Sequence, residues 1–239
     1  MPGRRPLELR RRSEVNKRDP ESPLSPRIDS FESVVANPDF PCVFATRALV
    51  DDELLFGSLE NLDCTLGDIA AAVGDAVQVI AMDPAQVVIL FIGAGSTSLE
   101  EDNALAAAIT RELMHSSELD WPLDQSRDPA DPLWILWVNG VDLFVNYSTP
   151  NHALRKSRNV GSSFAMILQS RSSFDRFAGR NNSTRTVIRK RLERYDGIPV
   201  HAALGSFGDV DNREIEQFFL GDGTETVDLL PGARKCPFH

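Results

Sequence analysis

The side chains best suited to acid–base or metal chemistry are the four histidines, because imidazole titrates near neutral pH and binds metals as the neutral ring. His115 falls near the end of an expected helix, and His239 is the last residue. We interpret both as surface or terminal positions. His152 and His201 are therefore the candidates for a ligand or an acid–base role.

His152 lies in a segment rich in basic side chains, with Arg155, Lys156 and Arg158 within the next six residues. An iron porphyrin can use such a set, with the imidazole on the iron and guanidinium groups on the propionates. The alternative interpretation is an Arg/Lys-rich turn that carries an incidental histidine. The local pattern leaves both open.

Two other sequence patterns give weaker indications of a cofactor or metal site. The segment Gly93-Ala-Gly95-Ser-Thr-Ser98 resembles a dinucleotide-binding loop but has Ser at its third small position, so we expect a plain strand-to-helix turn. The cysteines Cys42, Cys64 and Cys236 are widely spaced and odd in number, which indicates neither a disulfide framework nor zinc. Cys42 and Cys236 neighbour Pro and Phe and are interpreted as small buried hydrophobes, with a thiolate-ligated haem as the lesser alternative.

The elements that must position these residues follow from periodicity and capping. Asn139-Gly140 between two apolar runs predicts a β-hairpin with a type I′ turn. The expected strands are Val87–Ile92, Trp134–Val138, Val141–Tyr147 and Ser163–Gln169. The expected helices are Ser30–Ala36, Thr65–Met82, Ser98–Ser116, Ser172–Ala178, Thr184–Tyr195 and Asn212–Leu220. This order predicts an α+β fold, a single domain with a central mixed or antiparallel sheet flanked by helices.

Composition bounds the class of protein. The 239 residues are 42% hydrophobic and 25% charged, which suits one domain at 29–239 behind a disordered or wrapping N-terminal arm at 1–28. A net charge of -10 disfavours nucleic acid as a partner. No apolar run is long enough to span a membrane and no secretory signal is present, so we expect a cytoplasmic protein.

A set of short motifs extends from Phe40 to Phe238. They are Phe40-Pro-Cys42, Trp121-Pro122, Phe144-Val-Asn146, Thr149-Pro-Asn-His152-Ala-Leu-Arg155-Lys-Ser-Arg158-Asn159, Arg189-Lys-Arg191, Tyr195-Asp-Gly197, Leu204-Gly-Ser-Phe207-Gly208, Asp211-Asn-Arg213-Glu214 and Cys236-Pro-Phe238. In this order they resemble the YqcI/YcgG family, over most of the chain.

The resemblance implies a haem-dependent N-hydroxylase that oxidises a guanidino nitrogen, with L-arginine converted to Nω-hydroxy-L-arginine in antibiotic or other secondary-metabolite biosynthesis. It implies haem b as cofactor, O₂ or peroxide as oxidant and an external electron donor. His152 would be the proximal iron ligand, with His201 as the fallback, and Arg155 and Arg158 would meet the propionates. A homodimer is also expected.

A guanidinium substrate calls for a carboxylate in bidentate geometry. Asp120, Asp196 and Glu214 are the candidates within the motif regions, against the alternative that each is a surface acid or a helix cap. Trp121, Phe144 and Phe207 could wall a haem pocket or simply belong to the core. The competing functions are a non-catalytic haem-binding or sensing protein and an enzyme acting on another amine.

Overall fold

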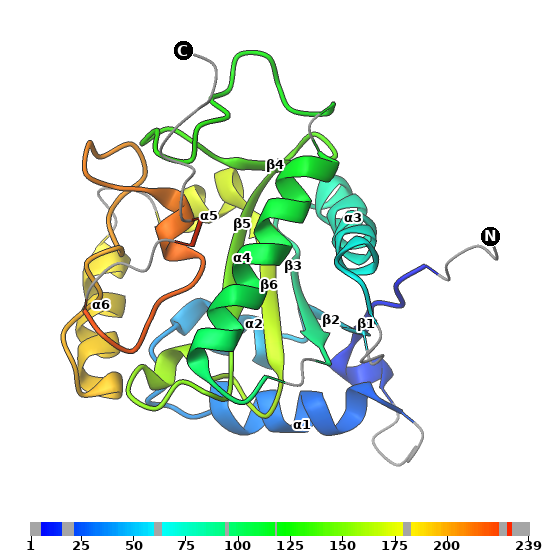
Figure 1. Ribbon diagram of the computed structural model, residues 1–239. Helices are drawn as coiled ribbons and strands as arrows, with labels where there is room; N and C mark the ends of the chain where they lie inside the picture. The colour runs from blue at the N-terminus through cyan, green and yellow to red at the C-terminus, as the bar shows by residue number, and fades with distance from the viewer. Residues whose placement is uncertain are drawn as a thin grey trace.

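A six-stranded mixed sheet forms the centre of the computed structural model, which describes residues 6–15, 22–59, 64–93, 96–117, 119–178, 183–224 and 229–230 (Figure 1). Its strands run in the order β1-β2-β3-β6-β5-β4. Their bounds are β1 Arg10–Arg11, β2 Leu54–Leu59, β3 Val87–Ile92, β4 Leu136–Val138, β5 Val141–Ser148 and β6 Phe164–Ser170. Only β2 and β3 are parallel, and the remaining neighbours are antiparallel.

Helices cover both faces of this sheet. Their bounds are α1 Leu24–Val35, α2 Val43–Val50, α3 Leu66–Met82, α4 Leu99–Ser116, α5 Arg171–Ala178 and α6 Ser183–Asp196, with short 3₁₀ helices η1 Arg12–Glu14, η2 Lys156–Arg158 and η3 Glu214–Gln217. Figure 1 shows α4 and α3 in front of the sheet and α2 behind it. None of the helices in the described ranges combines the length and the apolar character that a membrane span requires.

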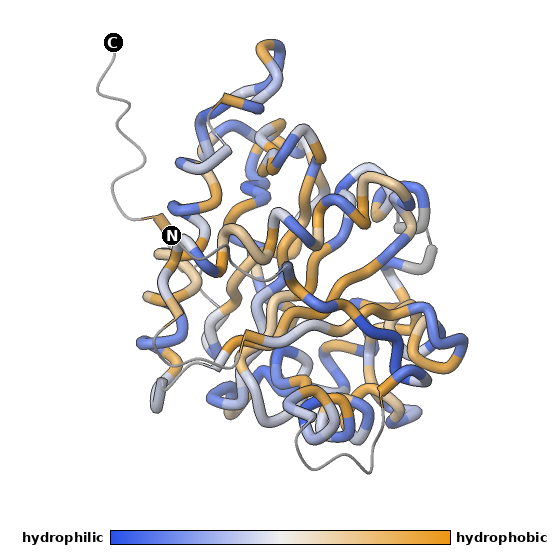
Figure 2. The backbone as a smooth tube through the Cα atoms, turned by 90° about the vertical axis from the view of Figure 1, so that its right-hand side faces the viewer, coloured by the Kyte–Doolittle hydropathy of each residue, from blue (hydrophilic) through white to orange (hydrophobic). Residues whose placement is uncertain are grey.

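Strand periodicity divides the core into two layers. Val88, Leu90 and Ile92 pack with α3 and α4, whereas Ile89 and Phe91 pack with α1. Side chains on β3 are therefore apolar on both faces, as expected for a central strand covered by helices on each side. Figure 2 shows the apolar strands in the middle of the molecule with more polar segments around them.

Local sequence signals explain why the main elements form where they do. Thr65 caps α3 with a reciprocal bond from Asp68, and Ser98 caps α4. Asn139 and Gly140 have φ values of 49° and 75°, which the predicted type I′ turn requires. The α+β fold, β3, the hairpin, α3 and α4 are as the sequence predicts.

The N-terminal region differs from the prediction. The helix expected at Ser30–Ala36 begins earlier, at Leu24, because Pro23 and Pro26 lie in its cap and first turn, where no backbone N–H is needed. The predicted boundary after residue 28 thus falls inside α1. Before it, β1 pairs antiparallel with β2 at the edge of the sheet, and Leu7 and Leu9 pack against the core.

Three further elements depart from the sequence pattern. The chain forms α2 and β2, for which no signal was found, because both are short and β2 contains a glycine. The helix expected at Asn212–Leu220 is wrong: only the 3₁₀ turn η3 forms there. Cytoplasmic location and a homodimer stay predictions.

Candidate active site

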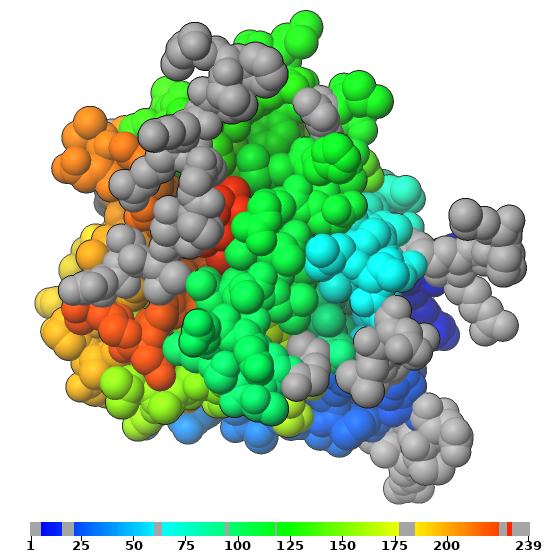
Figure 3. Space-filling view, in the orientation of Figure 1, coloured from blue at the N-terminus to red at the C-terminus, as the bar shows by residue number. Residues whose placement is uncertain are grey.

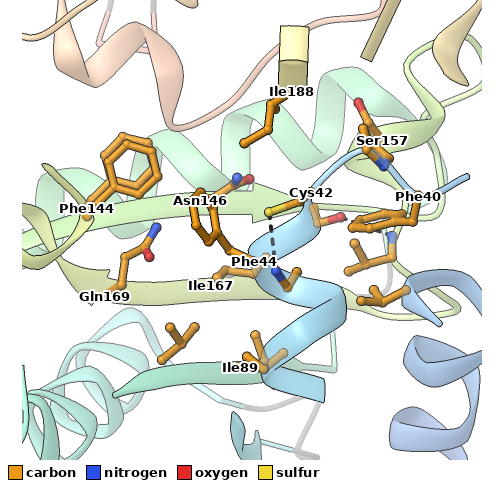
Figure 4. Close-up of a pocket in the computed structure, with 18 of the residues that line it drawn as sticks. Phe40, Cys42, Phe44, Ile89, Phe144, Asn146, Ser157, Ile167, Gln169 and Ile188 are labelled. Carbon is orange, nitrogen blue, oxygen red and sulfur yellow. Dashed lines mark hydrogen bonds between the residues drawn. The ribbon is translucent and has the colours of Figure 1, made fainter. Parts of the chain in front are cut away.

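A cavity of about 630 Å³ lies on the sheet face that α1 and α2 cover (Figure 4). This volume is within the usual range for ligand and cofactor pockets. Its floor consists of alternate side chains of β3, β5 and β6, and its walls come from α2 and α6. The labelled residues of Figure 4 that line it are Phe40, Cys42, Phe44, Ile89, Phe144, Asn146, Ser157, Ile167, Gln169 and Ile188. Aromatic and aliphatic groups predominate, with a few polar side chains among them.

Arg158 brings a buried positive charge to this cavity. Its Nη1 donates to the side-chain oxygen of Asn146, and its Nη2 donates to the carbonyl of Gln217 at 3.4 Å. Burial, and then the charge of Arg155, lower the pKa of Arg158 to about 10, although Asp196 and Cys42 act in the opposite direction. A guanidinium with neutral partners in an apolar cavity favours an anionic ligand.

Arg155 is the second buried guanidinium of the cavity lining and is 2% exposed. It donates from Nε to the carbonyl of Gly221 at 3.0 Å and from Nη2 to that of Gly223 at 2.8 Å. Its Nη1 lies 3.7 Å from a carboxylate oxygen of Asp196. Arg155 and Arg158, which the sequence pairs with haem propionates, are thus brought to one cavity.

Cys42 also lines the cavity, at the N-cap of α2. Its Sγ accepts a bond from the backbone N–H of Ala45 at 3.4 Å, which Figure 4 shows as a dashed line. Burial raises the pKa of the Cys42 thiol, whereas the backbone N–H groups of Ala45 and Phe44 and the charges of Arg158 and Arg191 lower it. A bound metal ion would favour the thiolate in such surroundings.

His152 is also buried and belongs to the same chain segment as Arg155. The cavity-lining residues that the structure describes do not include it. Its Nδ1 lies 3.2 Å from Oδ1 of Asp222, and its ring lies 5.6 Å from that of Phe219. Burial lowers the pKa of His152 to about 4 despite the opposing effect of Asp222, so the ring is neutral at neutral pH. Its Nε2 is buried and has no hydrogen-bond partner among the described residues.

Asp222 organises this loop, and nothing in its sequence context identified it. The carboxylate accepts the backbone N–H groups of Ala153, Leu154 and Arg155 at 2.8–3.1 Å, in addition to facing His152. These bonds lower the pKa of Asp222 against the effect of burial. Figure 3 shows the segment that carries Asp222, coloured orange to red, beside α4 in green.

His201, the fallback ligand, is 2% exposed, and its Nδ1 accepts the backbone N–H of Ala203 at 3.1 Å. His201 is not among the described residues that line the cavity. Of the remaining predicted segments, residues 94 and 95 of the glycine-rich turn, Cys236 and His239 lie outside the described residues.

The three candidate carboxylates do not face the cavity together. Asp120 is exposed. Asp196 is buried and accepts both the N–H and the hydroxyl of Ser157, at 2.7 and 2.8 Å. Glu214 is buried and lies 2.5 Å from Nε of Arg171. Burial raises the pKa of Glu214 to about 7, although Arg171 lowers it. The structure therefore commits two of the three to internal partners.

The aromatic candidates also separate. Phe144 lines the cavity and stacks on Phe174 at 5.4 Å. Trp121 packs against Trp134 in the other core layer, and the Phe207 ring lies 4.7 Å from the guanidinium of Arg171. One of the three therefore contributes to the pocket.

Comparison with known proteins agrees with the motif order. The model of the YqcI/YcgG family matches residues 31–239. The chain belongs to the YqcI/YcgG family. It is 30% identical over 218 residues to DcsA of Streptomyces lavendulae, whose name provisionally assigns it Nω-hydroxy-L-arginine synthesis; the match covers 85% of this chain and 82% of DcsA.

Two Bacillus subtilis proteins without an assigned function are also similar. The protein YcgG is 32% identical over 211 residues, covering 83% of this chain and 80% of YcgG. The protein YqcI is 36% identical over 145 residues, covering 59% of this chain and 54% of YqcI. No solved structure matches the chain.

Proposed function

We propose that this chain is a haem-dependent N-hydroxylase that oxidises a guanidino nitrogen, with L-arginine as its substrate and Nω-hydroxy-L-arginine as its product. The observation that supports the proposal most is the apolar cavity lined by two buried guanidinium groups, Arg155 and Arg158. The likeness to DcsA supports the substrate class.

The residues present fit haem b. Its flat apolar ring suits walls of Phe40, Phe44 and Phe144, and its two propionates suit the two arginines. When bound, haem would supply the oxygen chemistry that no side chain provides. With O₂, hydroxylation consumes two electrons and two protons and releases water, so an external donor is needed; with peroxide it is not.

The protein's own contribution would be to hold the haem and to enclose the cavity around it. Arg155 and Arg158 would fix the propionates. The apolar side chains of α2 and α6 that line the cavity, among them Ile188 and Leu192, would limit the access of water to the bound group. Exclusion of water strengthens the polar contacts inside. The reacting nitrogen must then be held by the polar groups of the floor.

Cys42 would hold the haem iron through its Sγ, because it lines the cavity and carries a potential iron-binding atom. His152, the ligand that the sequence predicts, remains the second candidate. Its buried Nε2 without a partner and its Nδ1 on Asp222 are features of metal-binding histidines.

Spectra of the haem-loaded protein distinguish the two ligands. In the ferrous–CO complex, a thiolate ligand shifts the Soret band to longer wavelength than an imidazole ligand does. We expect this shift in the wild type and in His152→Ala, and its loss in Cys42→Ser. Loss of haem colour in His152→Ala with an unchanged Cys42→Ser spectrum would instead assign the iron to His152.

The activity itself is tested by mass spectrometry. Haem-loaded protein, incubated with L-arginine and either a reductant with O₂ or peroxide, should yield arginine with one additional oxygen atom. Haem binding without any product from arginine or related amines would favour a haem-binding or sensing protein. Product from another amine alone would correct the substrate.

A further inference from the structure

Within the described part of the chain, the cavity lining has no buried carboxylate for a guanidinium substrate to meet. Among the described lining residues, the acidic side chain is Glu53, which is exposed to solvent. Asp196 and Glu214 are bound to Ser157 and Arg171. Recognition deep in the cavity must therefore use neutral polar groups.

Two side-chain amides lie on the sheet strands that form the floor of the cavity. Gln169 on β6 pairs with Phe144 on β5, and Asn146 pairs with Ile167, so the two amides are diagonal neighbours on one sheet face. Such neighbours lie roughly 7–8 Å apart, close enough for both to contact one planar ligand group. Figure 4 shows Gln169 and Asn146 on this floor together with Phe144 and Ile167.

Gln169 is the less committed of the pair. Its amide makes no hydrogen bond with any described residue, although it faces a mostly apolar cavity. Asn146 accepts from Arg158 through its oxygen, which leaves its NH₂ group available. A partly buried amide without a partner is unfavourable, so a ligand that pairs with it gains affinity.

We propose that Gln169, supported by Asn146, is the specificity-determining residue that binds the substrate's guanidino group through its neutral amide. This inference rests on the proposed function. The amide oxygen accepts a guanidino N–H, and the amide NH₂ donates to an unprotonated guanidine nitrogen.

A neutral recognition group has a chemical consequence. A carboxylate would stabilise the guanidinium cation, whereas an amide leaves the balance to burial and to neighbouring charge. In this cavity both act against the cation, as they do on Arg158, whose pKa burial and Arg155 lower. The neutral guanidine has the nitrogen lone pair that oxidation requires.

The test uses haem-loaded protein and L-arginine. Titration calorimetry should show that the Kd for L-arginine rises by roughly 10-fold in Gln169→Leu, because one hydrogen-bonding partner is lost. The haem content should be unchanged. Gln78→Leu, at an exposed position on α3, is the matched control and should bind like the wild type. A wild-type Kd in Gln169→Leu overturns the inference.

Gln169→Glu provides a second, independent readout. A carboxylate there should tighten arginine binding and move the rising limb of the pH profile of kcat/KM to higher pH, because it stabilises the cation. An unchanged affinity for arginine and an unchanged pH profile in Gln169→Glu would contradict the inference, even if Gln169→Leu fails to fold. Failure of the proposed function is separate, since it shows as absence of hydroxylated product in the wild type.

Discussion

Two arginines and one aspartate determine what the loop after β5 presents to the cavity. Arg155 and Arg158 face inward, while Asp222 collects the backbone N–H groups of the loop and thereby holds Arg155 in place. Arg155 and Arg158 could be singled out in the sequence because basic residues cluster there, and both line the cavity; their contact with haem propionates stays a proposal. Asp222 could not be predicted, since its partners lie about seventy residues away along the chain.

Removal of Arg158 should weaken cofactor binding. Arg158→Leu retains an aliphatic side chain, like the aliphatic part of arginine, but removes the buried charge. We therefore expect the Kd for haem to rise by roughly 10- to 100-fold. Haem titration followed by absorbance measures this. Lys156→Leu, at an exposed position two residues away, is the control. Equal affinities of the two variants would exclude Arg158 as a propionate partner.

His152 makes stability depend on pH. The pKa of His152 is about 4 in the folded protein and 6.5 in the unfolded chain. As pH falls, the unfolded chain therefore takes up a proton before the folded protein does. The free energy of unfolding should be fully retained above pH 6.5 and decline towards pH 4, by about 3 kcal/mol from this group. Urea unfolding across this range should show a shallower decline in His152→Asn. An identical slope would contradict the burial of a neutral imidazole.

At the scale of elements, predictions succeeded where local chemistry decides the structure. The caps Thr65 and Ser98 and the turn at Asn139-Gly140 act over a few residues, so their elements were found. The sequence missed α2 and β2 because tertiary packing rather than propensity stabilises short elements. This omission had consequences for the site, because α2 carries Cys42 into the cavity.

The hairpin turn offers a test at this scale. Gly140 has φ of 75° with no atom within 4 Å of an added Cβ, so Gly140→Ala should destabilise through backbone strain alone, by about 1 kcal/mol. Gly67→Ala in the first turn of α3 is the control, because its Cβ would meet only Thr65 at 3.7 Å. Chemical denaturation compares the two. A stabilised Gly140→Ala would contradict the turn conformation.

At the scale of the whole molecule, the cavity is a product of topology. Its lining comes from α1, α2, α5 and α6 and from β2, β3, β5 and β6, which are scattered over most of the chain. Sequence reasoning identified the α+β fold and the two arginines, but the partner of each candidate carboxylate and the floor amides depend on strand register. Gln169 gave no signal in the sequence because its proposed role depends on its place opposite Phe144.

The central claim is that this cavity binds haem, and one absorption spectrum tests it most directly. Protein produced with iron and a haem precursor, then purified, should show a Soret band with close to one haem per chain. A fully folded, colourless protein that takes up no haem on titration would contradict the account.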